Sequence, residues 1–341
     1  MSTDRHASDT TDDLGAFVPA WWCRGAHAQT IWAATLCPPP RLAAHEEQWE
    51  TPDGDFLSLD HVPAAAHSPI LLTLHGLEGS SKTPIIRRFL RAARDAGWRG
   101  LAVNFRSCSG RLNRLARSYH GGDTSDLRWI IQHVTAQYPR APLCCVGISL
   151  GANILLKYLG EEGDRVPAAL TAAATISTPF DLAQSAQSFE RGFFNRIYMH
   201  RLVRSLTRKT RQKLRRYPHL IDRRQLNAIR TIRQFDELVT APVHGFASAA
   251  HYWATSSCRS FLASIRRPTL LINALDDPLV DADTMPRDIL TANPYLSAVF
   301  PDAGGHTGFV SGTYPWQPKM WAQEKALHFF KQQLGPQSAD L

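Results

Sequence analysis

Short apolar runs alternate with longer segments of helical periodicity along most of the chain. The runs are bounded by glycine, proline or polar clusters, as buried strands usually are. They occupy residues 56–62, 70–74, 101–105, 142–146, 172–176, 269–274 and 298–300. Segments 84–96 and 124–138 repeat apolar residues every three or four positions, which predicts helices. This alternation predicts a mostly parallel sheet with helices on both faces, and the apolar–polar alternation within run 56–62 predicts an edge strand.

The alternation stops between about residues 180 and 262, where the pattern indicates no strand. An apolar stripe recurs there at intervals of four, at Phe194, Tyr198, Leu202 and Leu206. Because this segment stands between two predicted sheet strands, we expect it to form a helical cap over residues 181–262, inserted above the site. The core then comprises residues 17–180 and 263–335. Residues 1–16 are polar, without an apolar stretch, and are expected to be a disordered tail.

The segment Gly147-Ile148-Ser149-Leu150-Gly151 follows one apolar run and precedes a helical pattern. A G-x-S-x-G sequence at a strand-to-helix turn is typical of a nucleophile elbow, a sharp bend that raises one serine hydroxyl above a sheet. The alternative is a glycine-flanked turn whose serine only caps the helix. The context favours Ser149 as a nucleophile, which then needs a base and an acid that orients the base.

An acid and a base follow the serine in the order expected for such a hydrolase. Asp276 and Asp277 come directly after an apolar run, at the carboxyl end of a predicted strand, where open α/β sheets carry functional groups. Asp277 fits the catalytic acid, and Asp276 is expected to orient the loop. His306 lies in a glycine-rich loop between the last predicted strand and a final helix predicted over residues 317–334, and is the expected base.

The oxyanion hole of such a site uses two backbone N–H groups. One belongs to the residue after the nucleophile, here Leu150. The other comes from the loop after an early strand, where the order His75-Gly76-Leu77-Glu78-Gly79 points to Leu77. His75 is expected to organise this loop rather than to take part in the chemistry.

Several further segments carry a resemblance to a known family. They are Trp21-Trp22, His27 to Trp32, Asn104 to Gly110, Asn113-Arg114, Ser118 to His120, Gly122 to Thr124 and Gly304 to Phe309. With the elbow and the acid loop, they resemble the YheT-like branch of the α/β-hydrolase superfamily over nearly the whole chain. The resemblance implies the α/β-hydrolase fold, a mostly parallel central sheet flanked by helices with an inserted helical cap, and a carboxylesterase- or lipase-like activity. Ser107 stands where this resemblance leads us to expect glycine.

Composition fits this picture. A length of 341 residues suits one large domain or a domain with an insertion, and 44% apolar residues is ordinary for a globular protein. Six cysteines show no metal-like spacing, so a reduced, cytoplasmic setting is expected. A serine mechanism requires no cofactor and no metal, and no apolar run approaches the length of a membrane span.

The cap segment carries a strongly basic stretch. Between Arg191 and Arg233, arginine and lysine recur throughout and Asp222 is the one acidic residue, in a chain of net charge +8. The stretch is read first as a solvated helical face. Weak contact with anionic membrane surfaces is a second interpretation, and an acidic or CoA-bearing substrate is another. Nucleic acid is not an expected partner, because no recognition fold accompanies the charge.

These observations predict a serine hydrolase that cleaves short- to medium-chain acyl esters or lipid esters. Ser149, His306 and Asp277 would form the triad, and the reaction would pass through an acyl-enzyme. Two alternatives stay open. One is an acyltransferase that uses the same triad, and the other is a catalytically silent ligand-binding protein with this fold.

Overall fold

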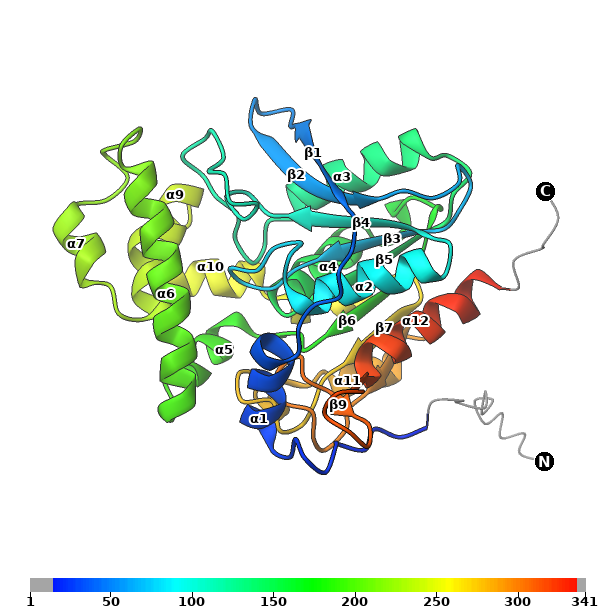
Figure 1. The fold of residues 1–341 in the computed structure, drawn as a ribbon. Helices are drawn as coiled ribbons and strands as arrows, with labels where there is room; N and C mark the ends of the chain where they lie inside the picture. Colours follow the sequence, from blue (N-terminus) through cyan, green and yellow to red (C-terminus); the bar gives the residue numbers. More distant parts are fainter. Residues whose placement is uncertain (1–14, 336–341) are drawn as a thin grey trace, which may run out of the picture.

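The structure is a computed structural model that describes residues 15–335, so nearly all of the predicted N-terminal tail lies outside the described residues. An eight-stranded sheet forms its centre, with strand order β1-β2-β4-β3-β5-β6-β7-β8 (Figure 1). The strands are β1 (His45–Glu50), β2 (Phe56–Val62), β3 (Ile70–Leu74), β4 (Arg99–Asn104), β5 (Leu143–Ile148), β6 (Leu170–Ile176), β7 (Thr269–Ile272) and β8 (Leu296–Val299). β2 pairs antiparallel with β1 and β4, and every pair from β4 to β8 is parallel.

The prediction that residues 56–62 form an edge strand is wrong. β2 lies inside the sheet and all its residues are buried, including the polar Ser58 and Asp60. β1, with the sequence HEEQWE, covers it and forms the edge instead. The alternation of polar and apolar residues in β2 resembles that of a strand with one face in solvent. The actual edge strand, β1, carries charged residues that discourage pairing with another chain.

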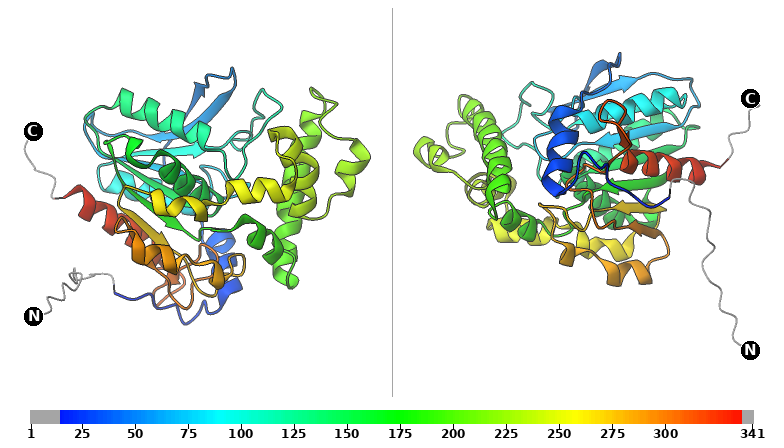
Figure 2. Two further views of the ribbon diagram at one scale, coloured as in Figure 1. Left: turned by 180° about the vertical axis from the view of Figure 1, so that it is seen from behind. Right: turned by 60° about the horizontal axis from the view of Figure 1, so that its bottom comes forward.

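Helices cover both faces of the sheet (Figure 2). α3 (Thr124–Gln137) and α4 (Leu150–Glu162) pack on one face, and α2 (Pro84–Asp95) and α12 (Trp321–Leu334) pack on the other. Cys145 belongs to the first apolar cluster and Cys144 to the second, because adjacent strand residues point to opposite faces. The final helix begins at Trp321 rather than Gln317, since Lys319–Met320 (β10) pairs with Val310–Ser311 (β9).

Short helical elements complete the core. They are α1 (Ala26–Ile31), η1 (Trp32–Leu36), η2 (Gly163–Arg165), η5 (Ala282–Thr284) and α11 (Arg287–Ala292). η1 and the segment before α1 pack against the chain around Val310 through an apolar cluster that includes Ala20 and Cys23, and Gln29 of α1 forms hydrogen bonds with Val310. The N-terminal part of the described chain thus lies beside the loop that carries His306.

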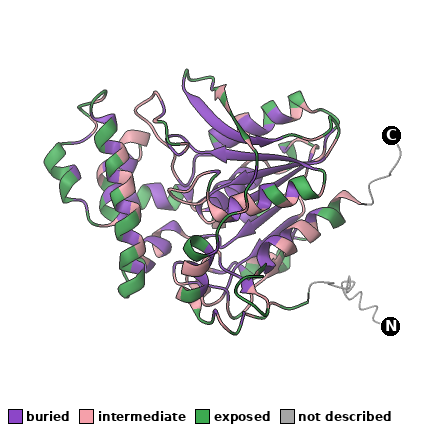
Figure 3. Cartoon of the chain, in the orientation of Figure 1, coloured by how far each residue is buried: buried purple, intermediate pink, exposed green. Residues whose placement is uncertain are grey.

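Between β6 and β7, the described residues form helices and no strand. The elements are α5 (Leu182–Ser188), α6 (Phe193–Lys213), α7 (Arg223–Ala228), α8 (Ile232–Phe235), η3 (Asp236–Thr240), α9 (Ala241–His244), α10 (Ala249–Ser256) and η4 (Cys258–Ser264). We call residues 181–262 the cap. Figures 1 and 3 show most of it as a helical layer at one side of the sheet, with exposed residues on its outer surface.

Helix α6 buries a different row of residues from the predicted apolar stripe. The buried row is Asn195, Met199, Val203, Thr207, Thr210 and Lys213. Of the predicted stripe, Phe194 is exposed and Leu202 lines an open cleft beside Ser149. The polar residues of the buried row form hydrogen bonds, such as the one from Thr207 Oγ1 to the Val203 carbonyl (2.8 Å), although Asn195 Oδ1 has no partner among the described residues. Hydrophobic periodicity does not register such residues.

None of the helices formed by residues 15–335 combines the length and the apolar content that a membrane-spanning helix needs.

Candidate active site

Ser149 occupies a sharp turn between β5 and α4. Its backbone has φ +52° and ψ −118°, a conformation that costs a non-glycine residue on the order of 1–3 kcal/mol. The Ser149 N–H donates to the Ile176 carbonyl of β6 at 2.9 Å, which holds the turn to the sheet. Two residues on, a Cβ atom at Gly151 would lie 2.6 Å from the Leu74 and His75 carbonyl oxygens. Only glycine allows α4 to approach β3 this closely.

The three residues predicted for the triad lie together. His306 Nε2 is 2.9 Å from Ser149 Oγ, and His306 Nδ1 is 2.9 Å from Asp277 Oδ2. The Asp277 side chain is fully buried and accepts the N–H groups of Leu279 (2.8 Å) and Val280 (3.2 Å) through Oδ1. These donors fix the carboxylate, and the carboxylate in turn favours the imidazole tautomer that has its proton on Nδ1.

Asp276 contacts the histidine loop rather than the histidine ring. Its Oδ1 accepts the Gly305 N–H at 2.8 Å, as expected for a residue that orients the loop. The His306 N–H donates to Thr30 Oγ1 of α1 at 2.9 Å, and the Thr307 N–H donates to Ser177 Oγ at 2.9 Å. The sequence pattern indicates no role for Thr30 or Ser177. Thr30 lies in the His27–Trp32 segment, but nothing in that pattern shows which loop it reaches.

The two predicted oxyanion donors lie on either side of the serine. Leu150 is the first residue of α4, and Leu77 follows Gly76, where an added Cβ would lie 3.1 Å from Ser149 Cβ. Within residues 15–335, neither the Leu77 N–H nor the Leu150 N–H donates to a protein acceptor. Both are therefore available to a ligand oxygen at Ser149.

His75 holds the oxyanion loop in place through both of its ring nitrogens. Its Nδ1 donates to the Gly76 carbonyl (2.7 Å), and its Nε2 accepts the Phe105 N–H (3.1 Å). Burial lowers the pKa of His75 to about 4. Both ring nitrogens are satisfied only in the neutral form, because a protonated Nε2 could not accept from Phe105.

A lysine of the cap binds the oxyanion loop. Lys209 Nζ of α6 lies 2.9 Å from Glu78 Oε1, and the same oxygen accepts the Tyr119 hydroxyl at 3.1 Å. The Glu78 N–H donates back to the Tyr119 hydroxyl at 2.8 Å, and Glu78 has a positive φ of 56°. The residue beside Leu77 is thus held by both cap and core.

A second lysine of α6 fastens the cap to a core loop. Lys213 Nζ donates to the carbonyls of Leu115 (3.0 Å), Ala116 (3.1 Å) and Arg117 (2.8 Å). Burial lowers the pKa of Lys213 to about 7. The prediction that Lys209 and Lys213 belong to a solvated basic face is therefore wrong. Both point inward because polar groups of the core receive them.

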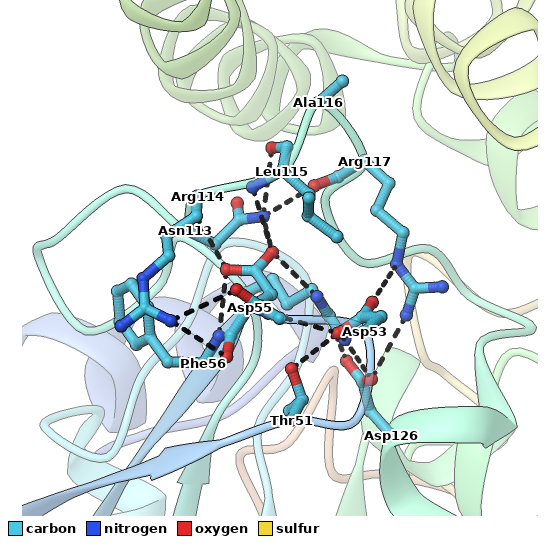
Figure 4. Close-up of polar contacts among 12 residues, drawn as sticks. Thr51, Asp53, Asp55, Phe56, Asn113, Arg114, Leu115, Ala116, Arg117 and Asp126 are labelled. Carbon is cyan, nitrogen blue, oxygen red and sulfur yellow. Dashed lines mark hydrogen bonds and ion pairs between the residues drawn. The ribbon is translucent and has the colours of Figure 1, made fainter.

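A buried ion network supports the core loop that contains Leu115 and Arg117 (Figure 4). The Arg106 guanidinium is almost fully buried and binds Asp126 through two bonds of 2.7 Å and Asp55 at 2.8 Å. Burial alone would raise the pKa of Asp55, but hydrogen bonds from Asn113 and from the Arg114 and Phe56 N–H groups lower it. Removing one partner of a buried pair of this kind typically costs about 3–5 kcal/mol, because the other charge is left buried without a partner.

Ser107 adopts φ +66°, a left-handed conformation that explains the glycine expected there. The Ser107 hydroxyl donates to Asn113 Oδ1 (2.6 Å) and accepts the Asn113 N–H (3.2 Å). These bonds offset the strain of a side chain at this position.

An apolar pocket opens at Ser149, between cap and core. Its cap side is formed by α5, α8 and α10, and its polar rim includes Ser149 and His306. Asp236 lies in its wall, where its carboxylate accepts the Thr240 hydroxyl (2.7 Å) and Trp253 Nε1 (2.9 Å). Burial raises the pKa of Asp236 to about 6. The rest of the lining is largely apolar.

One group in the described chain could offer metal ligands. His45 Nε2, Glu47 Oε1 and His61 Nδ1 lie 3.0–3.1 Å from one another on β1 and β2. A neutral His61 that ligates a metal through Nδ1 would carry its proton on Nε2, yet Arg99 Nη1 donates to that Nε2 at 2.8 Å. The residues therefore fit a hydrogen-bonded cluster better than a metal site.

Comparison with known proteins agrees with the fold. A family model described as the alpha/beta hydrolase fold matches residues 69–313. The chain belongs to the α/β-hydrolase family. It is 36% identical to "Putative esterase YheT" of Escherichia coli strain K12, over 91% of each chain. The resemblance to the YheT-like branch is thereby confirmed.

Other α/β-hydrolase relatives carry lipase names. A mouse protein named phospholipase ABHD3 is 30% identical over 88% of this chain and 75% of its own length. A Saccharomyces cerevisiae monoacylglycerol lipase is 32% identical over 82% of this chain and 62% of its own length. The solved structure of the Pyrococcus furiosus esterase Pf2001 aligns with a TM-score of 0.54 and 17% identity, over 87% of this chain and 100% of the other, which supports the fold alone.

We predict unequal effects of the two neighbouring aspartates. Asp277→Asn should lower kcat by roughly 10³–10⁴-fold, because the amide would favour the wrong imidazole tautomer. Asp276→Asn should cost far less, since its amide oxygen can still accept the Gly305 N–H. Steady-state kinetics on one p-nitrophenyl ester measure both. A larger loss for Asp276→Asn would contradict the assignment.

A second prediction concerns acid stability. Because the pKa of His75 falls from 6.5 when unfolded to about 4 when folded, the unfolded state binds more protons between these values, so stability is lost as pH falls through this window. Between pH 7 and pH 4, the free energy of unfolding of His75→Gln should therefore fall by about 3 kcal/mol less than that of the wild-type protein. Denaturant unfolding of both proteins at the two pH values measures the difference. Equal pH dependence in both would show that His75 is not buried in its neutral form.

Proposed function

We propose that the protein is a serine hydrolase of carboxylic esters, acting on short- to medium-chain acyl or lipid esters. The hydrogen-bonded series Asp277–His306–Ser149, at the mouth of an apolar pocket, is the observation that carries this proposal. The esterase and lipase names of its relatives support the same class of reaction.

The first half of the reaction forms an acyl-enzyme. Ser149 Oγ attacks the acyl carbon while His306 Nε2 takes its proton. Asp277 stabilises the resulting imidazolium. The carbonyl oxygen becomes an oxyanion that accepts the N–H groups of Leu77 and Leu150, and each such donor is typically worth ~10²–10³ in rate. The tetrahedral intermediate then breaks its bond to the alcohol oxygen, which receives the proton from His306.

In the second half, water repeats these steps. His306 takes a proton from water, the oxygen of the water attacks the acyl carbon, and the bond to Ser149 Oγ breaks. The carboxylic acid leaves and Ser149 regains its proton. An acyltransferase would use an alcohol in place of water at this step, so the two activities differ only in the second acceptor.

The apolar pocket is the proposed acyl site. It adjoins Ser149 on the side of α5, where Leu182 and Ala186 line it, and its far wall includes Phe235 and Trp253. The small number of polar groups there suits a hydrocarbon chain, because the binding of such a chain is favoured mainly by the removal of apolar surface from water.

The chemical state of the cysteines agrees with the cytoplasmic location proposed from sequence. All six are free and buried. Burial raises the pKa of Cys108 to about 11 and of Cys144 to about 12, so these thiols stay protonated at neutral pH.

Covalent labelling tests the nucleophile. The wild-type protein should react with a fluorophosphonate probe at Ser149 and release p-nitrophenol from acyl esters. Ser149→Ala should lose both properties, because no other residue between 15 and 335 has a hydroxyl bonded to His306 Nε2. Equal labelling of the variant would contradict the assignment, and absence of turnover by the wild-type protein on every ester would favour the silent ligand-binding protein.

A matched pair of variants tests the acyl site. Ala186→Leu should shift the preferred p-nitrophenyl ester to a shorter chain, because the added methyl groups fill the pocket. Ala183→Leu adds the same volume on the same helix outside the pocket and should leave the chain-length profile unchanged. A shift of equal size in both variants would show that the helix moves and that the pocket does not select the acyl chain.

A further inference from the structure

Ser149 and His306 face a second opening besides the apolar pocket. It is an open cleft between the start of α2 and one face of α6. Leu77, Phe189 and Leu279 border both spaces, so a molecule bound at Ser149 can extend into each. An ester has two halves, and the apolar pocket suits the acyl half. The cleft is then left to the alcohol half.

The cleft is lined by cations from two sides. Arg201, Arg204 and Arg208 project from one face of α6, since they are three and four residues apart, and Lys82 projects from the turn before α2. All four side chains are exposed. Within residues 15–335, none of them makes an ion pair with a carboxylate.

Acidic groups do not neutralise this cleft. Glu78 is the one acidic residue in its lining, and its buried carboxylate is occupied by Lys209. Some other arginines of the cap donate to protein acceptors. Arg196 donates to the Glu190 carbonyl (3.3 Å) and Arg211 donates to Asn227 Oδ1 (2.9 Å). Within residues 15–335, the three arginines of the cleft have no such acceptor, and neither do the exposed cap residues Arg215, Arg223 and Arg224. What distinguishes the cleft from the rest of the basic surface is that its unpaired arginines line the same space as Ser149 and His306.

We propose that this cleft binds an anionic, phosphate-bearing leaving group, so that the favoured substrate is an acyl ester of a phosphorylated alcohol. This inference rests on the proposed ester hydrolysis at Ser149. Guanidinium groups bind phosphate oxygens through paired hydrogen bonds, and several in one cleft select for such a group. Cleavage joins the acyl carbon to Ser149 Oγ and breaks its bond to the alcohol oxygen, which takes the proton from His306 and departs with the phosphate intact.

A pair of substrates that differ only in the phosphate tests the proposal. We would compare 1-octanoylglycerol 3-phosphate with 1-octanoylglycerol, both monomeric and without vesicles, by release of octanoate at low ionic strength. The wild-type kcat/KM should favour the phosphorylated ester by about 10–100-fold, as expected for one or two charge-assisted hydrogen bonds. p-Nitrophenyl octanoate, run beside them, reports the ester hydrolysis itself.

Two variants with equal loss of charge locate the effect. The cleft variant carries Arg201→Gln, Arg204→Gln and Arg208→Gln. The control variant carries Arg215→Gln, Arg223→Gln and Arg224→Gln, which are exposed cap residues outside the cleft. The ratio of the two kcat/KM values should fall towards one in the cleft variant and stay at its wild-type value in the control.

Each other outcome overturns a defined part of the proposal. Equal use of the two glycerol esters by the wild-type protein, or an equal fall of the ratio in both variants, would refute the subsite while leaving ester hydrolysis intact. A preference that arises only when the phosphorylated ester is presented in anionic vesicles would assign the basic face to membrane contact instead. Failure to hydrolyse even p-nitrophenyl octanoate would refute the proposed function itself.

Discussion

The close approach of α4 to β3 is the constraint on which the site depends. Gly151 lets the first turn of α4 lie against the carbonyls of Leu74 and His75, and the strained backbone of Ser149 turns the chain between β5 and that helix. The same approach places the oxyanion loop, which continues β3, beside Ser149. A larger residue at position 151 would separate the serine from Leu77, so one packing contact fixes the position of Ser149 relative to both proposed oxyanion donors.

The cap and the oxyanion loop are mechanically connected. Lys209 reaches from α6 to Glu78, beside Leu77, and Lys213 reaches from the same helix to the loop that precedes Tyr119. Both lysines exchange water for protein acceptors. The acceptors of Lys213 lie on a loop that bonds to Asp55 and Asp126 of the ion network, whereas Glu78, the acceptor of Lys209, is held by Tyr119. The helix that lines the basic cleft is therefore also the helix that holds the oxyanion loop. A substrate that contacts the cleft face of α6 would thus contact the same helix that positions Glu78, next to Leu77.

The sequence was sufficient for the fold class, for the strand-to-helix turn and for selecting Ser149, Asp277 and His306 as side chains that lie together, because each depends on local pattern. It also separated Asp277 from Asp276 by their order in the loop, and the two side chains do take different partners. The sequence pattern was misleading where polar side chains are buried and hydrogen bonds offset the cost of their burial. The polar residues of β2 looked solvated, and Lys213 looked like part of a charged surface. Thr30 and Ser177 were missed because contacts between loops distant in sequence leave no periodic signal.

The central claim is that an ester lies across Ser149 with its acyl chain under the cap and its carbonyl oxygen on two backbone N–H groups. A crystal structure of the protein inactivated by an octylphosphonate ester would test this most directly. The phosphorus should be bonded to Ser149 Oγ, with the phosphonyl oxygen about 2.7–3.1 Å from the Leu77 and Leu150 nitrogens and the octyl chain between α5, α8 and α10. An octyl chain lying along the basic face of α6, or a phosphonyl oxygen turned away from both nitrogens, would contradict it.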